Sequence, residues 1–141
     1  MNEQENTVSF FRFEDLRIYT KALDYLKWVY ESFNQVPEIY QETVVVNFGK
    51  AAQVIALNIA EGSARNKAQF VYYLKMAKSA VRECVVYTAL AYKLDLYGDV
   101  DHEYSRRQLM ELTKMIGSLV TSLQKVVDAS REGLNDDIDE I

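Results

Sequence analysis

The segment Asn58–Phe70, with the sequence NIAEGSARNKAQF, decides the fold of this chain. One long apolar stretch precedes it and another follows, so it predicts the end of one helix, a short turn and the start of the next. Gly62 suits the left-handed position just after a helix C-terminus. Asn66, with Gln69 three residues later, is typical of a capping box that opens a helix. The segment therefore predicts a tight joint between two antiparallel helices.

Apolar residues recur at alternating spacings of three and four in four segments, which is typical of helices that pack side by side at shallow angles. The remaining turns are expected around Pro37 and Gly98. We expect an all-α, antiparallel up-down-up-down, left-handed four-helix bundle over residues 13–127, after an N-terminal extension (1–12) and before an acidic, disordered tail (128–141). The predicted seams are Leu16, Tyr19, Leu23, Leu26, Tyr30 and Phe33; Val44, Phe48, Ala51, Ile55, Asn58 and Gly62; Phe70, Leu74, Ala77, Val81, Cys84, Thr88 and Ala91; and Leu109, Leu112, Ile116, Leu119, Leu123 and Val126.

Length and composition fit one globular domain in a reducing compartment. The chain has 141 residues, of which 49% are apolar, and a single cysteine, which permits no internal disulfide. Its apolar runs are too short and too often interrupted by charge to span a bilayer, and residues 1–6 lack the features of a signal peptide. We expect a cytoplasmic protein without a membrane partner.

The net charge of −5 is unevenly distributed. Residues 128–141 hold six acidic residues and one basic residue, whereas residues 50–82 hold six basic residues and one acidic residue, Glu61. A basic stripe along one helix is either a solvated face or a surface that follows a phosphate backbone, with Tyr72 and Tyr92 available for stacking. The candidate nucleic-acid-binding residues are Lys50, Arg65, Lys67, Lys75, Lys78 and Arg82.

The second predicted helix is apolar beyond its seam, because Val46, Leu57 and Ala60 lie opposite the inward residues. Such a face predicts a second helix that approaches closely, and hence a homo-oligomer. The third helix has a smaller excess, which a wide buried arc within one bundle explains equally well.

No catalytic, cofactor or metal site is expected. A di-metal bundle needs Glu-x-x-His on two helices, and the only histidine, His102, is expected to be a solvated residue of a first helical turn. Cys84 lies on an inward seam and is expected to be a core residue. Asn58 is expected to make an interhelical or backbone hydrogen bond, and Glu61 to pair with Arg65 or Lys67 or with backbone at the turn. Glu83 is assigned to a possible subunit interface. The predicted structural motif is Asn58, Glu61, Gly62, Asn66 and Glu83.

The chain resembles the bacterial four-helix-bundle family named after the intervening sequences of 23S rRNA genes. The resemblance covers residues 13–127 and includes Phe13-Glu14-Asp15-Leu16, Ala51-Ala52, Asn58-Ile59-Ala60-Glu61-Gly62, and Phe70, Leu74, Ala77, Ser79 and Glu83. It implies an up-down bundle that assembles into a ring, as a pentamer, without a defined activity.

A related group, accessory proteins of diversity-generating retroelements, binds nucleic acid and a reverse transcriptase through a basic pentameric barrel. Where the family often has two arginines before Ala-Ala, this chain has Gly49-Lys50, and Ile55-Ala56-Leu57 replaces a stretch that often contains proline. We therefore expect a non-enzymatic oligomeric scaffold or interaction protein. The alternative is an RNA- or DNA-binding accessory protein that uses the basic stripe on a ring.

Overall fold

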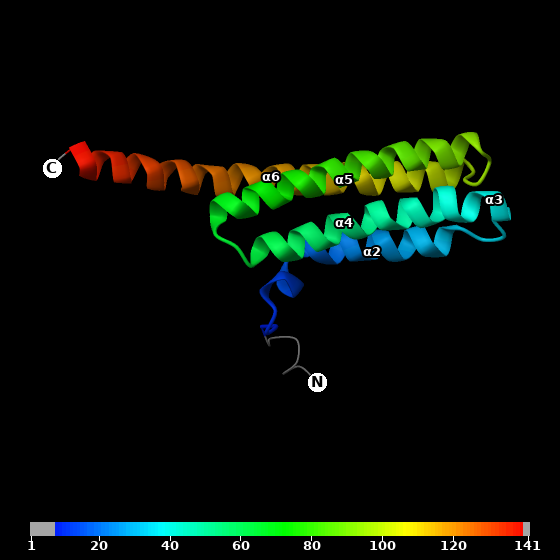
Figure 1. Ribbon diagram of the computed structural model, residues 1–141, viewed down its shortest axis with the longest axis horizontal. Coiled ribbons are helices and arrows are strands. Elements are labelled where there is room, and N and C mark those ends of the chain that lie inside the picture. Colours follow the sequence, from blue (N-terminus) through cyan, green and yellow to red (C-terminus); the bar gives the residue numbers. More distant parts are fainter. Residues whose placement is uncertain (1–7, 140–141) are drawn as a thin grey trace.

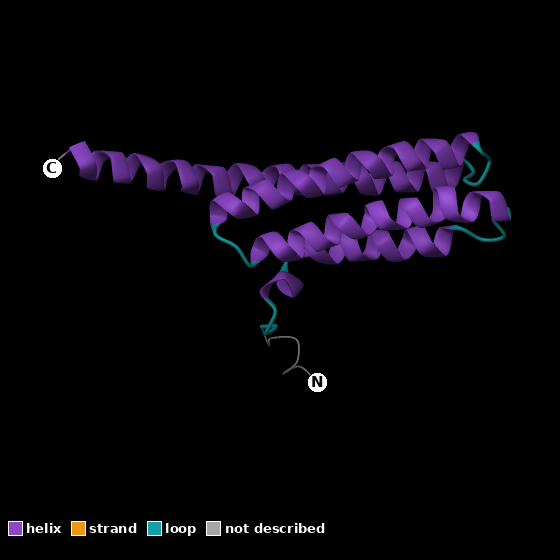
Figure 2. Ribbon diagram, viewed as in Figure 1, coloured by secondary structure: helices purple, strands orange, loops and turns teal. Residues whose placement is uncertain are grey.

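Four long helices make up the structure. The computed structural model describes the backbone of residues 8–139 and the side chains of residues 8–133, and no strand is present in this part of the chain. The long helices are α2 (Arg17–Ser32), α4 (Val46–Ser63), α5 (Lys67–Lys93) and α6 (Asp99–Asp139), arranged as in Figures 1 and 2. The prediction of an all-α four-helix chain is confirmed.

Short helical pieces precede two of the long helices. The 3-10 helix η1 (Arg12–Asp15) leads into α2, and α3 (Glu38–Tyr40) and the π-helix η2 (Gln41–Val45) lead without a break into α4. Pro37 stands at the N-cap of α3, as its fixed φ and missing N–H favour. The turn predicted around Pro37 is therefore present.

Side-chain contacts define which helices are neighbours. Tyr25 of α2 hydrogen-bonds Ser105 of α6, and Thr88 of α5 hydrogen-bonds the same Ser105. The rings of Phe33, after α2, and Phe48 of α4 lie 5.8 Å apart. Successive helices are joined by short turns at alternate ends of the molecule (Figure 1).

The joint between α4 and α5 forms where it was predicted, but Gly62 has a different role. Asn66 is the N-cap of α5, and its side-chain oxygen accepts a 2.9 Å hydrogen bond from the Gln69 backbone N–H. α4 continues to Ser63, and Gly62 lies inside it without a positive φ. A Cβ on Gly62 would lie 2.7 Å from Cβ of Tyr73 and 2.8 Å from Cδ1 of Phe70. The prediction of a left-handed Gly62 is therefore wrong: glycine is needed because α5 packs directly against it.

The predicted seam of α5 is confirmed, whereas that of α2 is only partly right: Leu16, Tyr19, Leu26 and Phe33 pack against the core without being fully buried. From Leu74 to Ala91, every predicted inward residue of α5 is buried. In α2, Leu23 and Tyr30 are 44% and 48% exposed. Both sets of α2 positions have helical spacing, so spacing alone did not distinguish them. The buried residues of α2 are Ile18, Ala22, Tyr25 and Val29.

The turn between α5 and α6 also differs from the prediction. α5 ends at Lys93, and Asp95 takes the left-handed conformation with φ 59°, whereas Gly98 has no positive φ. Aspartate tolerates this region better than most residues with a side chain. The Gly98 carbonyl instead accepts a hydrogen bond from the His102 backbone N–H, at the start of α6.

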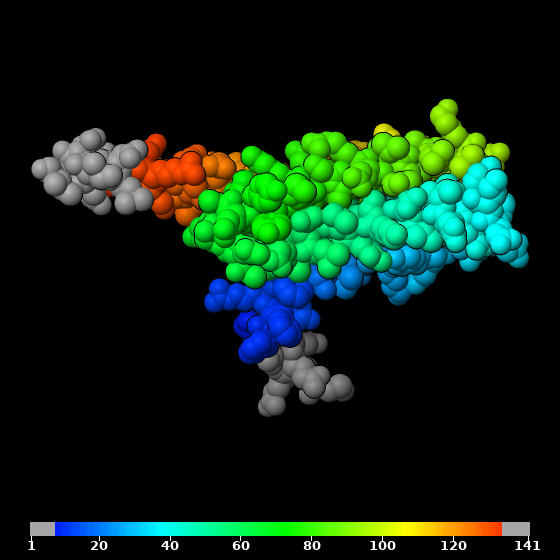
Figure 3. Space-filling view, in the orientation of Figure 1, coloured from blue at the N-terminus to red at the C-terminus, as the bar shows by residue number. Residues whose placement is uncertain are grey.

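α6 extends past the other helices through the acidic segment. Its backbone is helical to Asp139, where a disordered tail was predicted from residue 128, and residues 140–141 lie outside the described part. Figures 1 and 3 show this end of α6 projecting from the body of the molecule. Extending an existing helix costs far less than nucleating one, and this stretch contains no proline.

Among the described residues, one helical stretch, Glu38–Ser63, is long and apolar enough to cross a membrane by length and composition. Of the most apolar 18 residues of this stretch, 44% are buried inside the bundle. A core helix of a soluble protein passes the same test.

Candidate interaction surfaces

The predicted basic stripe lies mainly on α5. Lys75 and Arg82 are exposed on this helix and Lys78 is half-buried. Lys67 is the first residue of α5, Arg65 lies in the preceding turn, and Lys50 is exposed on α4, a different helix. The basic residues of α5 therefore lie along one helix, whereas Lys50 lies on another helix and is not part of this stripe.

Arg65 forms a salt bridge with a glutamate. Its Nη2 lies 2.6 Å from Oε1 of Glu61, one helical turn earlier, and its guanidinium lies 5.6 Å from the centre of the Tyr73 ring. The hydrogen bond to Glu61 is the main reason that the pKa of Arg65 is raised. Of the three partners expected for Glu61, which were Arg65, Lys67 and the backbone at the turn, the structure shows Arg65. Within residues 8–133, the other predicted basic residues have no acidic group at ion-pair distance.

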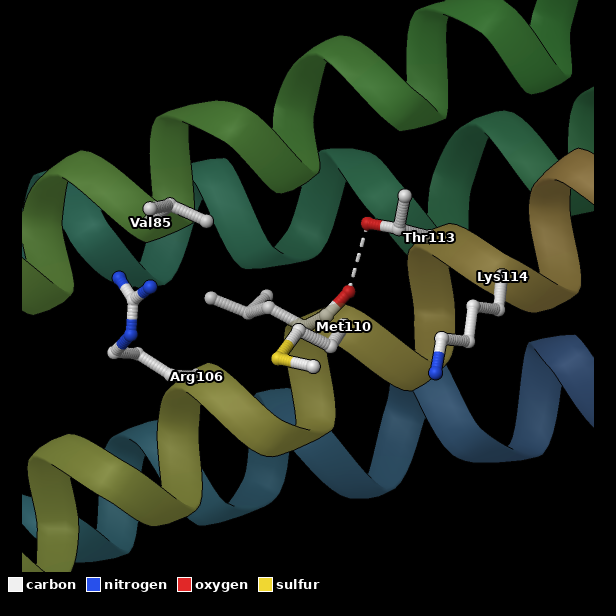
Figure 4. A pocket seen from close by; sticks show the side chains of 6 residues that line it. Val85, Arg106, Met110, Thr113 and Lys114 are labelled. Carbon is white, nitrogen blue, oxygen red and sulfur yellow. Dashed lines mark hydrogen bonds between the residues drawn. The ribbon is translucent and has the colours of Figure 1, made fainter.

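A cationic groove forms where α5 meets α6. Its floor is apolar, and Arg106 and Lys114 of α6 lie along it (Figure 4). Lys78 of α5 lies two turns before the groove residue Val85, on the same side of the helix. We call this feature the α5–α6 groove; its lining residues are Val85, Arg106, Leu109, Met110, Thr113 and Lys114.

Sequence reasoning missed the contribution of α6 to this groove. Arg106 and Lys114 are far from the basic stripe in sequence, and only the pairing of α5 with α6 brings them near Lys78. Thr88 hydrogen-bonds Ser105, and Val85 shares the groove with residues 106–114. The two helices are therefore antiparallel, so residues later in α6 lie beside residues earlier in α5. This register sets Lys78 at about the level of Lys114.

A second, apolar groove lies between α2 and α4. Leu57 is 63% exposed at its edge, and Leu23 of α2 lies across from it. Gln53 brings a side-chain amide to this groove, and its Nε2 donates a 2.6 Å hydrogen bond to the Tyr30 hydroxyl. We call this feature the α2–α4 groove; its lining residues are Phe13, Tyr19, Leu23, Leu26, Gln53, Ala56, Leu57 and Ala60.

The remaining motif residues have local roles. The Asn58 side chain donates a 3.0 Å hydrogen bond to the Val54 carbonyl of its own helix, so of the two predicted bonds the backbone one forms. Glu83 is exposed on α5. His102 is half-buried rather than fully solvated, because its ring lies 4.3 Å from that of Tyr92. The Tyr92 hydroxyl donates a hydrogen bond to Asp99, which is the main reason that its pKa is raised.

Cys84 is a core residue. Its side chain is fully buried, and desolvation, followed by the nearby Glu83 charge, raises its pKa to about 12. At neutral pH the thiol is therefore protonated and shielded from solvent. Among the described residues, no group of three or more His, Cys, Asp and Glu side chains is placed to hold a metal ion.

Three hydroxyls form a buried chain that the sequence pattern did not indicate. The Thr88 hydroxyl donates its one proton to the Cys84 carbonyl, at 2.7 Å. In the 2.7 Å hydrogen bond between Thr88 and Ser105, Ser105 is therefore the donor. Tyr25 in turn donates to Ser105 at 2.8 Å. Burial is the main reason that the pKa of Tyr25 is raised. The chain links α2, α5 and α6 with each of its donors satisfied.

Comparison with known proteins identifies the family. No curated protein matches the chain. A family model described as 23S rRNA-intervening sequence protein matches residues 14–118, which include the end of η1, all of α2, α4 and α5, and the first half of α6. This range covers most of the chain and contains the α5–α6 groove and every residue of the α2–α4 groove except Phe13. The chain therefore belongs to the 23S rRNA-intervening sequence protein family.

Proposed function

We propose that this protein is a non-enzymatic, homo-oligomeric four-helix-bundle scaffold or interaction protein of the cytoplasm, with a pentameric ring as its assembly. The observation that carries the proposal is the exposed apolar α2–α4 groove. We also propose that the bundle is left-handed and up-down-up-down; the short turns at alternate ends and the neighbouring pairs α2–α4, α4–α5, α5–α6 and α2–α6 support the up-down-up-down order.

The exposed side of α4 is unusually apolar for a surface helix. Val46, Val54 and Leu57 are 43%, 38% and 63% exposed, and α4 carries only two charged residues, Lys50 and Glu61. Full burial of one such aliphatic side chain contributes about 1.5–3 kcal/mol. Covering this face with another copy would remove several of these side chains from water together, which favours an oligomer.

A non-enzymatic role is supported by the environment of the groups that could act as nucleophile or base. Cys84 is buried and protonated, and the His102 ring lies against that of Tyr92 in a tilted arrangement. The buried hydroxyls of Tyr25, Thr88 and Ser105 are used in hydrogen bonds between helices. The thiol and the three hydroxyls therefore lie in the core, where they stabilise the bundle.

The assembly is tested by light scattering on the full chain and on Leu57→Glu. We expect a multiple of the 16.3 kDa chain mass for the parent and a lower mass for the variant, because a buried carboxylate would be unpaired at the interface. Val100→Glu is the matched control, since Val100 is 81% exposed at the start of α6, away from the groove. A monomeric parent at micromolar concentration would refute the proposal.

A second function, binding of RNA or DNA as an accessory protein, is favoured by one observation. Lys75 and Arg82 of α5 lack acidic partners among the described residues, and Arg106 and Lys114 of α6 extend the positive surface across the α5–α6 groove. Contacts with phosphates would release counterions, so affinity would fall steeply with salt.

Retention on heparin and on single-stranded RNA tests this second function. We expect the triple variant Lys75→Ala, Lys78→Ala and Arg82→Ala to lose retention. The control variant Arg12→Ala and Lys27→Ala with Lys125→Ala removes the same charge away from α5 and should retain it. A parent protein that is not retained at low salt, with or without residues 128–141, would eliminate nucleic-acid binding.

A further inference from the structure

The α5–α6 groove combines two properties that a ligand must match. Its floor is apolar, with Val85, Leu109 and Met110, and Met110 is 55% exposed. Arg106 and Lys114 bring positive charge to the α6 side (Figure 4). On α5, Lys78 and Arg82 precede Val85 by seven and three residues and so lie on or near the same side of the helix. The groove therefore fits a ligand with an apolar stripe flanked by negative charge.

The C-terminal segment of the same chain has this composition. Residues 128–141 contain six acidic residues, and the backbone is helical to Asp139. In the sequence, Val127, Leu134, Ile138 and Ile141 are separated by seven, four and three residues, which is the spacing of an apolar stripe on a helix. The segment thus has the pattern of an acidic amphipathic helix.

We propose that the acidic C-terminal segment of one copy binds in the α5–α6 groove of a second copy. The segment continues the helix that forms one wall of its own groove. Residue 128 follows Lys114 by 14 residues, which places it about 21 Å further along α6. α6 runs away from the body at this end (Figure 1), so the segment reaches a groove of this kind only on another molecule.

Binding of this kind resembles the placement of an amphipathic helix in an apolar groove, where the apolar stripe supplies most of the affinity. The surface charge pairs contribute less to affinity and instead set orientation and association rate. The inference deepens the proposed homo-oligomer, on which it rests, by naming a contact between copies that is separate from the α2–α4 groove. It also gives the uneven charge distribution of the chain a structural role.

Carbodiimide cross-linking on the full chain tests the contact, because this reagent joins carboxylates directly to lysine amines. An equal mixture of unlabelled and ¹⁵N-labelled protein distinguishes links between copies from links within one copy. We expect links from carboxylates of residues 128–141 to Lys78 or Lys114, carrying mixed isotopes. Links within one copy, or no links to these lysines, would overturn the proposal.

Charge reversal adds a direct readout. Arg82→Glu with Arg106→Glu should reduce these cross-links at least about tenfold, and the added changes Asp128→Lys and Glu132→Lys should restore them. Arg12→Glu with Lys27→Glu, on η1 and α2, is the matched control and should leave the yield unchanged. An equal loss in the control, or no recovery in the compensated variant, would contradict a specific contact.

Light scattering on the same samples separates failure of this contact from failure of the proposed assembly. A monomeric parent refutes the homo-oligomer, whereas an oligomeric parent without the expected cross-links refutes the tail contact alone. An RNA oligonucleotide that binds the parent at about 0.1 M salt, in the absence of tail cross-links, would assign the groove to nucleic acid and also overturn the contact.

Discussion

Replacing Gly62 by alanine should destabilise the protein although Gly62 lies inside a helix. The new Cβ would lie 2.7 Å from Cβ of Tyr73 and 2.8 Å from Cδ1 of Phe70. Cβ of Tyr73 is fixed to the backbone of α5, so relief requires a shift between α4 and α5. Overpacking of this kind costs about 1–3 kcal/mol. The higher helix propensity of alanine offsets at most about 1 kcal/mol of this cost.

We therefore expect Gly62→Ala to lower the free energy of unfolding by about 1–2 kcal/mol. With a urea dependence of about 2 kcal/mol per molar, the unfolding midpoint should fall by roughly 0.5–1 M. The assay is urea unfolding followed by circular dichroism at 222 nm. All variants are compared at one protomer concentration, because oligomerisation shifts apparent stability.

Two other glycines provide internal controls. Nothing lies within 4 Å of a Cβ added at Gly117 in α6, so Gly117→Ala should gain about 0.5–1 kcal/mol. At Gly49 the Cβ would meet the outer part of the Tyr30 ring at 2.7 Å, and Tyr30 is half exposed and able to move. The free energy of unfolding of Gly49→Ala should therefore lie between those of Gly62→Ala and Gly117→Ala. If Gly62→Ala proved as stable as Gly117→Ala, the reasoning from close helix contact would be refuted.

Three further predictions concern single side chains. Asn66→Ala removes the cap of α5 and should cost about 1 kcal/mol in the same unfolding assay, whereas Asn66→Asp should cost much less. Thr88→Val leaves the buried Ser105 hydroxyl without its acceptor and should cost about 1–3 kcal/mol. Thr88→Ser keeps the hydroxyl and loses only a buried methyl group, so it should be more stable than Thr88→Val. A Val variant with unchanged stability would contradict the hydroxyl chain. Cys84 should react with a thiol reagent only as the protein unfolds. Its raised pKa, about 12, should also make stability fall as pH rises above the ordinary thiol range, because the unfolded chain then ionises first, and Cys84→Ala should lessen this pH dependence.

The sequence predicted the helices well where a single reading fitted the apolar pattern. In α5, the inward residues from Leu74 to Ala91 were identified correctly, because the helix has one continuous apolar seam with charge elsewhere. In α2, tyrosines and leucines surround the helix, and two sets of positions have helical spacing. Burial of Tyr25 required a partner for its hydroxyl, and that partner, Ser105, lies 80 residues away in sequence. Local periodicity holds no information about such a partner.

The candidate surfaces were predicted in part for a related reason. The basic residues of α5 were visible as a stripe because they repeat within one helix. Arg106 and Lys114 complete the α5–α6 groove only through the pairing of α5 with α6. The acidic segment was recognised from its charge, but its helical backbone and its direction away from the bundle depend on the continuation of α6.

By itself, the sequence determined the number of helices, the joint at Asn58–Phe70 and the family, because these depend on spacing and on residues close together along the chain. Only the tertiary structure decided why Gly62 must be glycine, which side of α2 is buried and where the two grooves lie. These features arise from contacts between residues far apart in sequence, and their geometry is set by how closely the helices approach one another.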